Sequence, residues 1–86
     1  MSTLTLETEP LAAGVAVSDT ILRVTLQDGR ELSVPLDWFP RLRNASGSER
    51  ADWRLIGQGE GIHWPLIDED ISVRGLLAGH RQLRAA

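Results

Sequence analysis

The chain has 86 residues, with nine basic and twelve acidic side chains, a net charge of −3 and no Cys. A chain of this length folds as one domain with a small core, and without Cys it has neither disulfides nor thiolate metal ligands. It has no secretory signal and no apolar run that could cross a membrane, so we expect a soluble cytoplasmic protein that does not bind membranes. All nine basic residues are Arg and they form no basic stripe, which argues against nucleic-acid binding by this domain alone.

The first part of the chain predicts a leader followed by three strands. Residues 1–11 are polar and end after Pro10, which indicates a flexible leader. Residues 13–17 predict a first strand. Apolar and polar residues then alternate over 21–27 and over 30–36, which predicts two further strands. Together these segments predict the start of an antiparallel β-meander.

The Asp28-Gly29 pair predicts a hairpin, and the apolar pattern determines its register. A two-residue loop would place the apolar side chains of the two strands on opposite faces. A three-residue loop over 27–29 pairs Val24 with Leu32, so that the apolar side chains share one face. We therefore predict a type I turn followed by Gly29 in the left-handed conformation.

Two short helices are predicted after the third strand. Asp37 is expected to cap a first helical turn over 38–42, where an early proline is tolerated. Ser46 and Glu49 have the spacing of a capping box, which predicts a second helix that ends near Trp53.

The remaining residues predict two brief strands and a final helix. The strands are expected at 54–56 and 62–64, with a tight turn at the glycines between them. A helix is expected over 72–78, with Asp70 as its N-cap and Gly79 at its end.

The expected domain organisation is simple. Residues 12–79 form a single α+β domain, a small antiparallel β-meander with two or three short helices, and residues 80–86 form a flexible tail.

Three segments carry a resemblance to a known family. They are DGRELSVPLDWFPRL (28–42), ERADWRLIG (49–57) and GEGIHWPLIDEDISVRGLLAG (59–79). In this order they resemble the bacterial domain of unknown function 2442 family (DUF2442), over roughly Ala12 to Gly79. The resemblance implies a β-meander with short helices and no particular chemistry.

The same resemblance suggests a regulatory setting. Some family members carry an added helix-turn-helix domain, and others are encoded beside another short protein, an arrangement similar to toxin–antitoxin pairs. Because no helix-turn-helix domain is found in these 86 residues, DNA binding is not carried over to this chain.

His63 is the central candidate for a metal-binding or acid–base site. With Asp68, Glu69 or Asp70 it would suit zinc or a harder divalent ion, or it would form an acid–base pair for hydrolysis. However, no HxH or HxxxH spacing is present, and three successive acids on a loop cannot all converge on one ion. We therefore interpret His63 as a half-buried strand residue that donates to a backbone carbonyl, and we assign no catalytic residue, metal or cofactor.

The three Trp residues are the main candidates for a binding surface. One interpretation is that Trp38, Trp53 and Trp64 fill the core, each indole N–H bonded to a carbonyl. The alternative is that one or two of them remain partly exposed and anchor a protein partner together with Arg side chains such as Arg41. With His63, these four residues are the candidate binding residues.

Three functions follow from these observations. The favoured one is a small non-enzymatic module that binds and regulates another protein, antitoxin-like or transcription-associated, through Trp and Arg side chains and an open sheet edge. The alternative is a small metal-dependent or acid–base hydrolase that uses His63 with Asp68 or Glu69. The third, direct nucleic-acid binding through Arg, predicts binding that weakens with salt.

Overall fold

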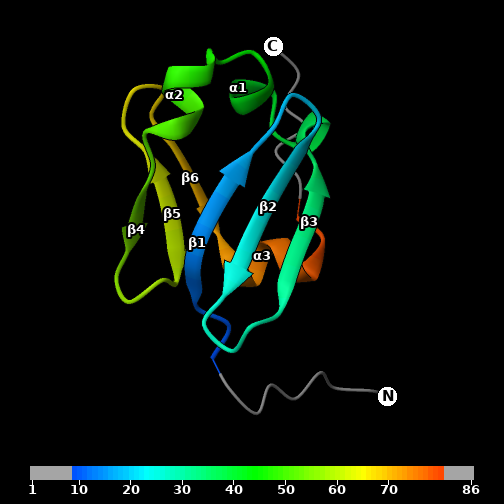
Figure 1. The fold of residues 1–86 in the computed structure, drawn as a ribbon, viewed down its shortest axis with the longest axis vertical. Coiled ribbons are helices and arrows are strands. Elements are labelled where there is room, and N and C mark those ends of the chain that lie inside the picture. The colour runs from blue at the N-terminus through cyan, green and yellow to red at the C-terminus, as the bar shows by residue number, and fades with distance from the viewer. Residues whose placement is uncertain (1–8, 81–86) are drawn as a thin grey trace.

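The computed structural model describes residues 9–80, which form two three-stranded antiparallel sheets and four short helical segments (Figure 1). The first sheet has the order β1 (Ala12–Val17), β2 (Ile21–Leu26), β3 (Glu31–Pro35), and the second has the order β4 (Arg54–Ile56), β5 (Gly61–Trp64), β6 (Glu69–Ser72). A 3-10 helix η1 (Leu36–Trp38) and the helices α1 (Pro40–Arg43) and α2 (Gly47–Ala51) connect the sheets, and α3 (Val73–Ala78) follows β6. The prediction of an α+β fold is confirmed, with one meander in each half of the chain.

The β2–β3 hairpin has the predicted register. Val24 lies opposite Leu32, and the N–H of Leu26 donates to the carbonyl of Arg30 at 2.8 Å. Gly29 has a φ of 95°, so the left-handed residue of the three-residue loop is where the sequence predicted it. The apolar side chains of both strands therefore face the core.

The first helical turn differs from the prediction. The chain turns directly out of β3, so that Pro35 stands at the cap position of η1 and Asp37 lies inside the turn. Helix α1 begins at Pro40 with Phe39 before it, and neither cap has a side-chain hydrogen bond. The prediction that Asp37 caps this turn is wrong; its carboxylate instead lies 3.5 Å from the guanidinium of Arg43.

Helix α2 begins at the predicted capping box. The Oγ atom of Ser46 accepts the N–H of Glu49 at 3.2 Å, and Oε1 of Glu49 accepts the N–H of Ser46 at 2.8 Å. The helix ends at Ala51, slightly before the predicted end. A short helix without any buried residue thus depends on its cap.

Helix α3 is capped by Ser72, whose Oγ accepts the N–H of Gly75 at 2.8 Å. The prediction that Asp70 caps it is wrong, because pairing of β6 with β5 continues to Ser72 and places Asp70 within the strand. The helix ends, as predicted, at Gly79, which has a φ of 84°. No helix in the described part of the chain is long and apolar enough to span a membrane.

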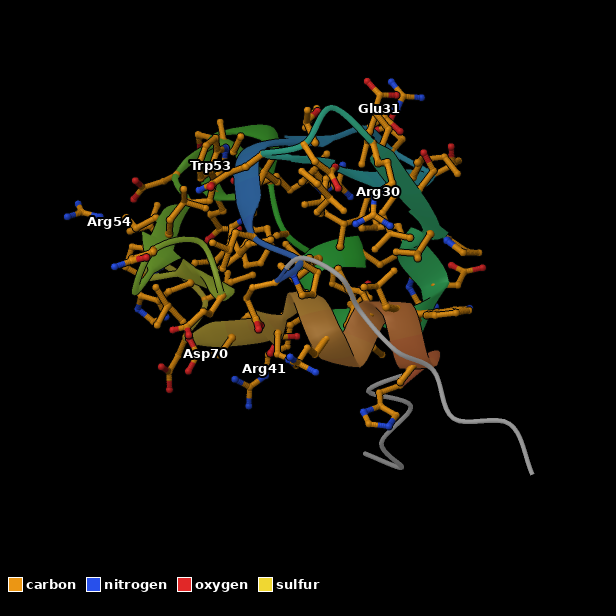
Figure 2. The ribbon with its side chains drawn as sticks, turned by 90° about the horizontal axis from the view of Figure 1, so that it is seen from below. Arg30, Glu31, Arg41, Trp53, Arg54 and Asp70 are labelled. Carbon is orange, nitrogen blue, oxygen red and sulfur yellow. The ribbon has the colours of Figure 1, made fainter. Side chains whose placement is uncertain are left out.

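The core lies between the first sheet and a layer formed by β5, β6 and α3, as seen from below in Figure 2. Its main side chains are Leu22, Val24 and Val34 from the first sheet, Leu36, Phe39 and Leu42 from the connection, Ile62, Trp64 and Ile71 from the second sheet, and Val73 and Leu76 from α3. Trp64 is completely buried, and its indole N–H donates to a backbone carbonyl as predicted.

The two sheets are joined where the start of β1 meets the β4–β5 turn. The N–H of Ala12 donates to the carbonyl of Gly59 at 2.7 Å, and Nε2 of Gln27 donates to the carbonyl of Gln58 at 3.0 Å. Gly59 has a φ of 108°, and a Cβ atom there would lie 2.4 Å from the carbonyl oxygen of Ala12. Only glycine therefore fits this junction.

Part of the predicted leader, residues 9–11, is described and contacts the domain. The guanidinium of Arg74 donates to both carboxylate oxygens of Glu9, at 2.8 and 3.0 Å, and this hydrogen bonding lowers the pKa of Glu9. Pro10 is buried, and the carbonyl of Leu11 accepts the N–H of Gln27, the residue after β2, at 2.9 Å. Residues 1–8 and 81–86, the rest of the predicted leader and tail, lie outside the described residues.

Candidate functional site

The second sheet places Arg54, His63 and Asp70 side by side on its outer face. Arg54 is paired with His63 across β4 and β5, and His63 is paired with Asp70 across β5 and β6. Directly opposed residues of an antiparallel sheet project from the same face. Nδ1 of His63 lies 2.5 Å from Oδ1 of Asp70, and the His63 side chain is 34% exposed. In Figure 2, Arg54 and Asp70 point away from the body of the domain.

His63 is thus a half-buried strand residue, as the sequence predicted. Its side-chain partner is a carboxylate on the neighbouring strand, whereas the sequence predicted a backbone carbonyl. The reason is the β5–β6 register, which places Asp70 directly across from His63.

Asp68 and Glu69 are not part of this row. Glu69 lies opposite Trp64 and is buried, with 4% of its surface exposed, so it projects from the face opposite to His63. Asp68 lies in the turn before β6 and has a φ of 52°. Successive strand residues alternate in direction, so the three neighbouring acids separate. Among residues 9–80, no group of three or more His, Asp and Glu residues could hold a metal ion.

The three Trp residues occupy different environments. Trp64 is in the core, and Trp38 and Trp53 are half-buried and packed against it. Arg41 holds the β5–β6 turn, because its Nη1 donates to the backbone carbonyl of Asp68 at 2.8 Å. Of these candidates Trp64 is covered by the core, whereas Trp38 and Trp53 are partly exposed and Arg41 is exposed.

Strand β4 is an edge of the second sheet, and all three of its residues are exposed. Leu55 is 37% exposed and Ile56 is 43% exposed. Sequence reasoning predicted an open edge without locating it at these two residues. A signal was present, because two successive apolar residues in a strand face opposite sides, and one of them must turn away from the core.

A pocket of about 530 Å³ is lined by residues of β6 and α3, together with Ile56 at the end of β4. Its apolar lining residues are Phe39, Ile56, Ile71 and Leu76, and its polar lining residues are Glu60, Asp70, Ser72 and His80. Gly61 and Gly75 also line it and contribute no side chain. A Cβ atom on Gly61 would lie 3.3 Å from Cδ1 of Ile56, so glycine keeps this part of the pocket open. No single sequence motif indicated the pocket, because its residues come from six separate stretches of the sequence.

The sequence of the chain matches the model of a known protein family. The family model described as protein of unknown function (DUF2442) matches residues 12–82. The chain belongs to the DUF2442 family. This confirms the resemblance inferred from the three sequence motifs.

Two solved structures are similar to this DUF2442 domain. A crystal structure of a protein of unknown function from Rhodospirillum rubrum is 32% identical, with a TM-score of 0.75, and the match covers 90% of this chain and 95% of that one. The solution structure of an uncharacterized protein from Chromobacterium violaceum shares the fold at 23% identity, with a TM-score of 0.71, over 83% of this chain and 67% of that one. A search of curated proteins found no match.

The third DUF2442 motif, residues 59–79, supplies most of the candidate site. It contains β5, β6 and α3, and with them the His63–Asp70 pair. The second motif, 49–57, contains the exposed strand β4. The family signature therefore lies over the second sheet and the pocket beside α3.

Proposed function

We propose that this DUF2442 domain is a small, non-enzymatic protein-interaction module that binds an extended segment of a partner along β4. The observation that supports this most directly is the exposure of Leu55 and Ile56 on an edge strand. An edge strand presents backbone N–H and C=O groups to a partner strand, and exposed large apolar side chains on such an edge favour association.

The two faces of β4 would contact different side chains of the partner. Leu55 is paired with the buried Ile62 and so faces the core side, whereas Arg54 and Ile56 lie on the outer face with His63. A partner strand would place alternate side chains against these two faces. Backbone hydrogen bonds would supply affinity, and the side chains next to Leu55 and Ile56 would supply selectivity.

We further propose that the partner is regulated by this binding, as in antitoxin-like or transcription-associated proteins. The support is the resemblance to family members encoded beside another short protein. A hydrolase that uses His63 with Asp68 or Glu69 has less support, because the side chain of His63 is bonded to Asp70 and Glu69 projects from the other face.

The test begins with co-purification of the tagged chain from its native host and identification of the retained protein. Binding is then measured by calorimetry with both proteins purified. We expect Ile56→Asp to weaken binding by about tenfold or more, since one buried apolar contact at an interface is commonly worth over 1 kcal/mol.

Leu66→Asp is the matched control, because Leu66 is 59% exposed and belongs to the β5–β6 turn, outside strand β4. It should leave binding unchanged, and circular dichroism should show that both variants are folded. Equal loss in the two variants, or full binding by Ile56→Asp, would contradict an interface at β4. A monomeric protein without a recoverable partner would contradict the interaction role itself.

A further inference from the structure

We propose that the pocket beside α3 binds a small organic cation with an apolar body, and that the carboxylate of Glu60 holds its positive group. This inference goes beyond the proposed partner binding at β4, because it concerns a different ligand and a different anchoring residue; Ile56 borders both surfaces. It depends on the size of the pocket, its apolar walls and the sign of the charge around it.

The pocket has the size and lining of a small-molecule site. Its volume of about 530 Å³ falls within the range typical of ligand pockets, roughly 300–1,000 Å³. Phe39, Ile71 and Leu76 are core residues, at most 4% exposed, so the walls that they form are held by the packed interior. Gly61 and Gly75 leave room for a ligand between these walls. A flat or branched apolar group would fill this space.

The charge around the pocket selects a cation. The ionisable residues that line it are Glu60, Asp70 and His80, and no Arg from the described part of the chain is among them. Two carboxylates near one cavity create a negative potential, which attracts cations and repels anions. Asp70 is hydrogen-bonded to His63, so it contributes mainly to this potential.

Glu60 is the carboxylate placed to contact the ligand directly. Its side chain forms no ion pair with any residue in the range 9–80. Its backbone is held on both sides, because its N–H donates to the carbonyl of Ile56 at 3.1 Å and its carbonyl accepts the N–H of Val73 at 3.0 Å. Its carboxylate extends back over Gly57, which has no side chain to block it. The backbone bonds therefore fix the position from which this exposed side chain extends.

The experiment is an NMR titration of the ¹⁵N-labelled full chain with three probes of one shape. The probes are 2-phenylethylammonium, the neutral 2-phenylethanol and the anionic phenylacetate. We expect saturable shifts at the backbone amides of Gly61, Ser72 and Gly75 with the ammonium probe. Affinity for the ammonium probe should exceed that for the alcohol by about fivefold, the upper range for a solvent-accessible charge pair, and phenylacetate should bind least.

Two variants test the role of Glu60. Glu60→Gln should lose the preference for the ammonium probe over the alcohol while retaining weak binding of both. Glu31→Gln is the control, because Glu31 is an exposed carboxylate on β3 of the other sheet and lies on the opposite side of the molecule from Asp70 in Figure 2. It should bind all three probes as the unchanged chain does.

Several results would overturn the proposal. Equal affinity for the three probes would indicate an apolar cavity without charge selection. Absence of saturable shifts at the pocket amides would remove the site, and an unchanged preference in Glu60→Gln would remove Glu60 as the anchor. Because Glu60→Gln leaves Leu55 and Ile56 intact, it should not alter partner binding at β4, so failure of one proposal can be distinguished from failure of the other.

Discussion

The indole N–H of Trp64 donates to the backbone carbonyl of Arg50 at 3.0 Å, and this bond joins the buried strand β5 to helix α2. The guanidinium of Arg50 then donates to the carbonyls of Leu42 and Arg43, at 2.9 and 2.7 Å, and lies 3.0 Å from Asp19 in the β1–β2 turn. Helix α2 has no buried residue of its own. Helix α2 is therefore held to β5 and to the preceding part of the connection by polar bonds made by Trp64 and Arg50.

Trp64→Phe should lower the free energy of unfolding by about 2–3 kcal/mol, because it removes both packed volume and the donor to the Arg50 carbonyl. Trp53→Phe is the matched control, since Trp53 is half-buried and should cost about 1 kcal/mol or less. Denaturant unfolding followed by far-UV circular dichroism measures both. Equal losses would contradict the special role of the Trp64–Arg50 bond.

Gly59→Ala should be strongly destabilising, on the order of 2–3 kcal/mol, because it combines a strained positive φ with a clash against a backbone carbonyl. Gly14→Ala should be neutral or stabilising by up to about 1 kcal/mol, because Gly14 lies in β1 and a Cβ atom there meets nothing within 4 Å. Thermal unfolding of the two variants gives the comparison. A tolerated Gly59→Ala would mean that β1 and the β4–β5 turn are not in close contact.

Ser72→Ala should lower stability by about 1 kcal/mol, because it removes the N-cap of α3. Hydrogen exchange should become faster at the amide of Gly75, which loses its acceptor. Asp70→Asn should leave exchange at Gly75 unchanged, since Asp70 lies within β6. Faster exchange at Gly75 in Asp70→Asn instead would restore Asp70 as the cap.

The stability of the β2–β3 hairpin should depend on acid pH through Asp28. The backbone N–H of Arg30 donates to Oδ1 of Asp28 at 3.0 Å and, with the Arg30 side chain, lowers the pKa of that carboxyl below its usual value. A lowered pKa in the folded state means that the contribution is present above the unfolded pKa and is lost as the pH falls through the folded pKa. We therefore expect it to be lost as the pH falls through and below the usual range of an aspartate.

The measurement is denaturant unfolding at several pH values for the unchanged chain and for Asp28→Asn. The variant should show a weaker decline in stability on acidification, and a carbon-detected NMR titration should place the Asp28 pKa below that of a free aspartate. Parallel pH profiles for the two proteins would show that Asp28 contributes nothing to acid sensitivity.

Local elements were largely predictable from the residues. The hairpin around Gly29 and the Ser46–Glu49 capping box depend on neighbours only a few positions apart, and both are found where they were predicted. The failures at Asp37 and Asp70 have a common cause. In each case strand pairing decided where the strand ended. The helical segment therefore began at a different residue from the one that the local capping pattern indicated.

The candidate site was predictable only in part. The sequence singled out His63 and the nearby acids, but three adjacent carboxylates look equivalent until strand alternation sends Glu69 inward and Asp70 outward. The pocket could not be found in this way, because Phe39, Glu60 and Leu76 are separated along the chain and meet only after the sheet and α3 pack together.

The sequence by itself determined the α+β class, the family, the β2–β3 turn and two helix caps, at Ser46 and Gly79, because these depend on composition, periodicity and short-range hydrogen bonding. The tertiary structure alone decided that His63 lies against Asp70, that Gly59 lies against Ala12, and that β4 is left as an exposed edge. The physical reason is that these relationships depend on the pairing of strands and the packing of two sheets around one small core, which bring together residues that no local pattern connects.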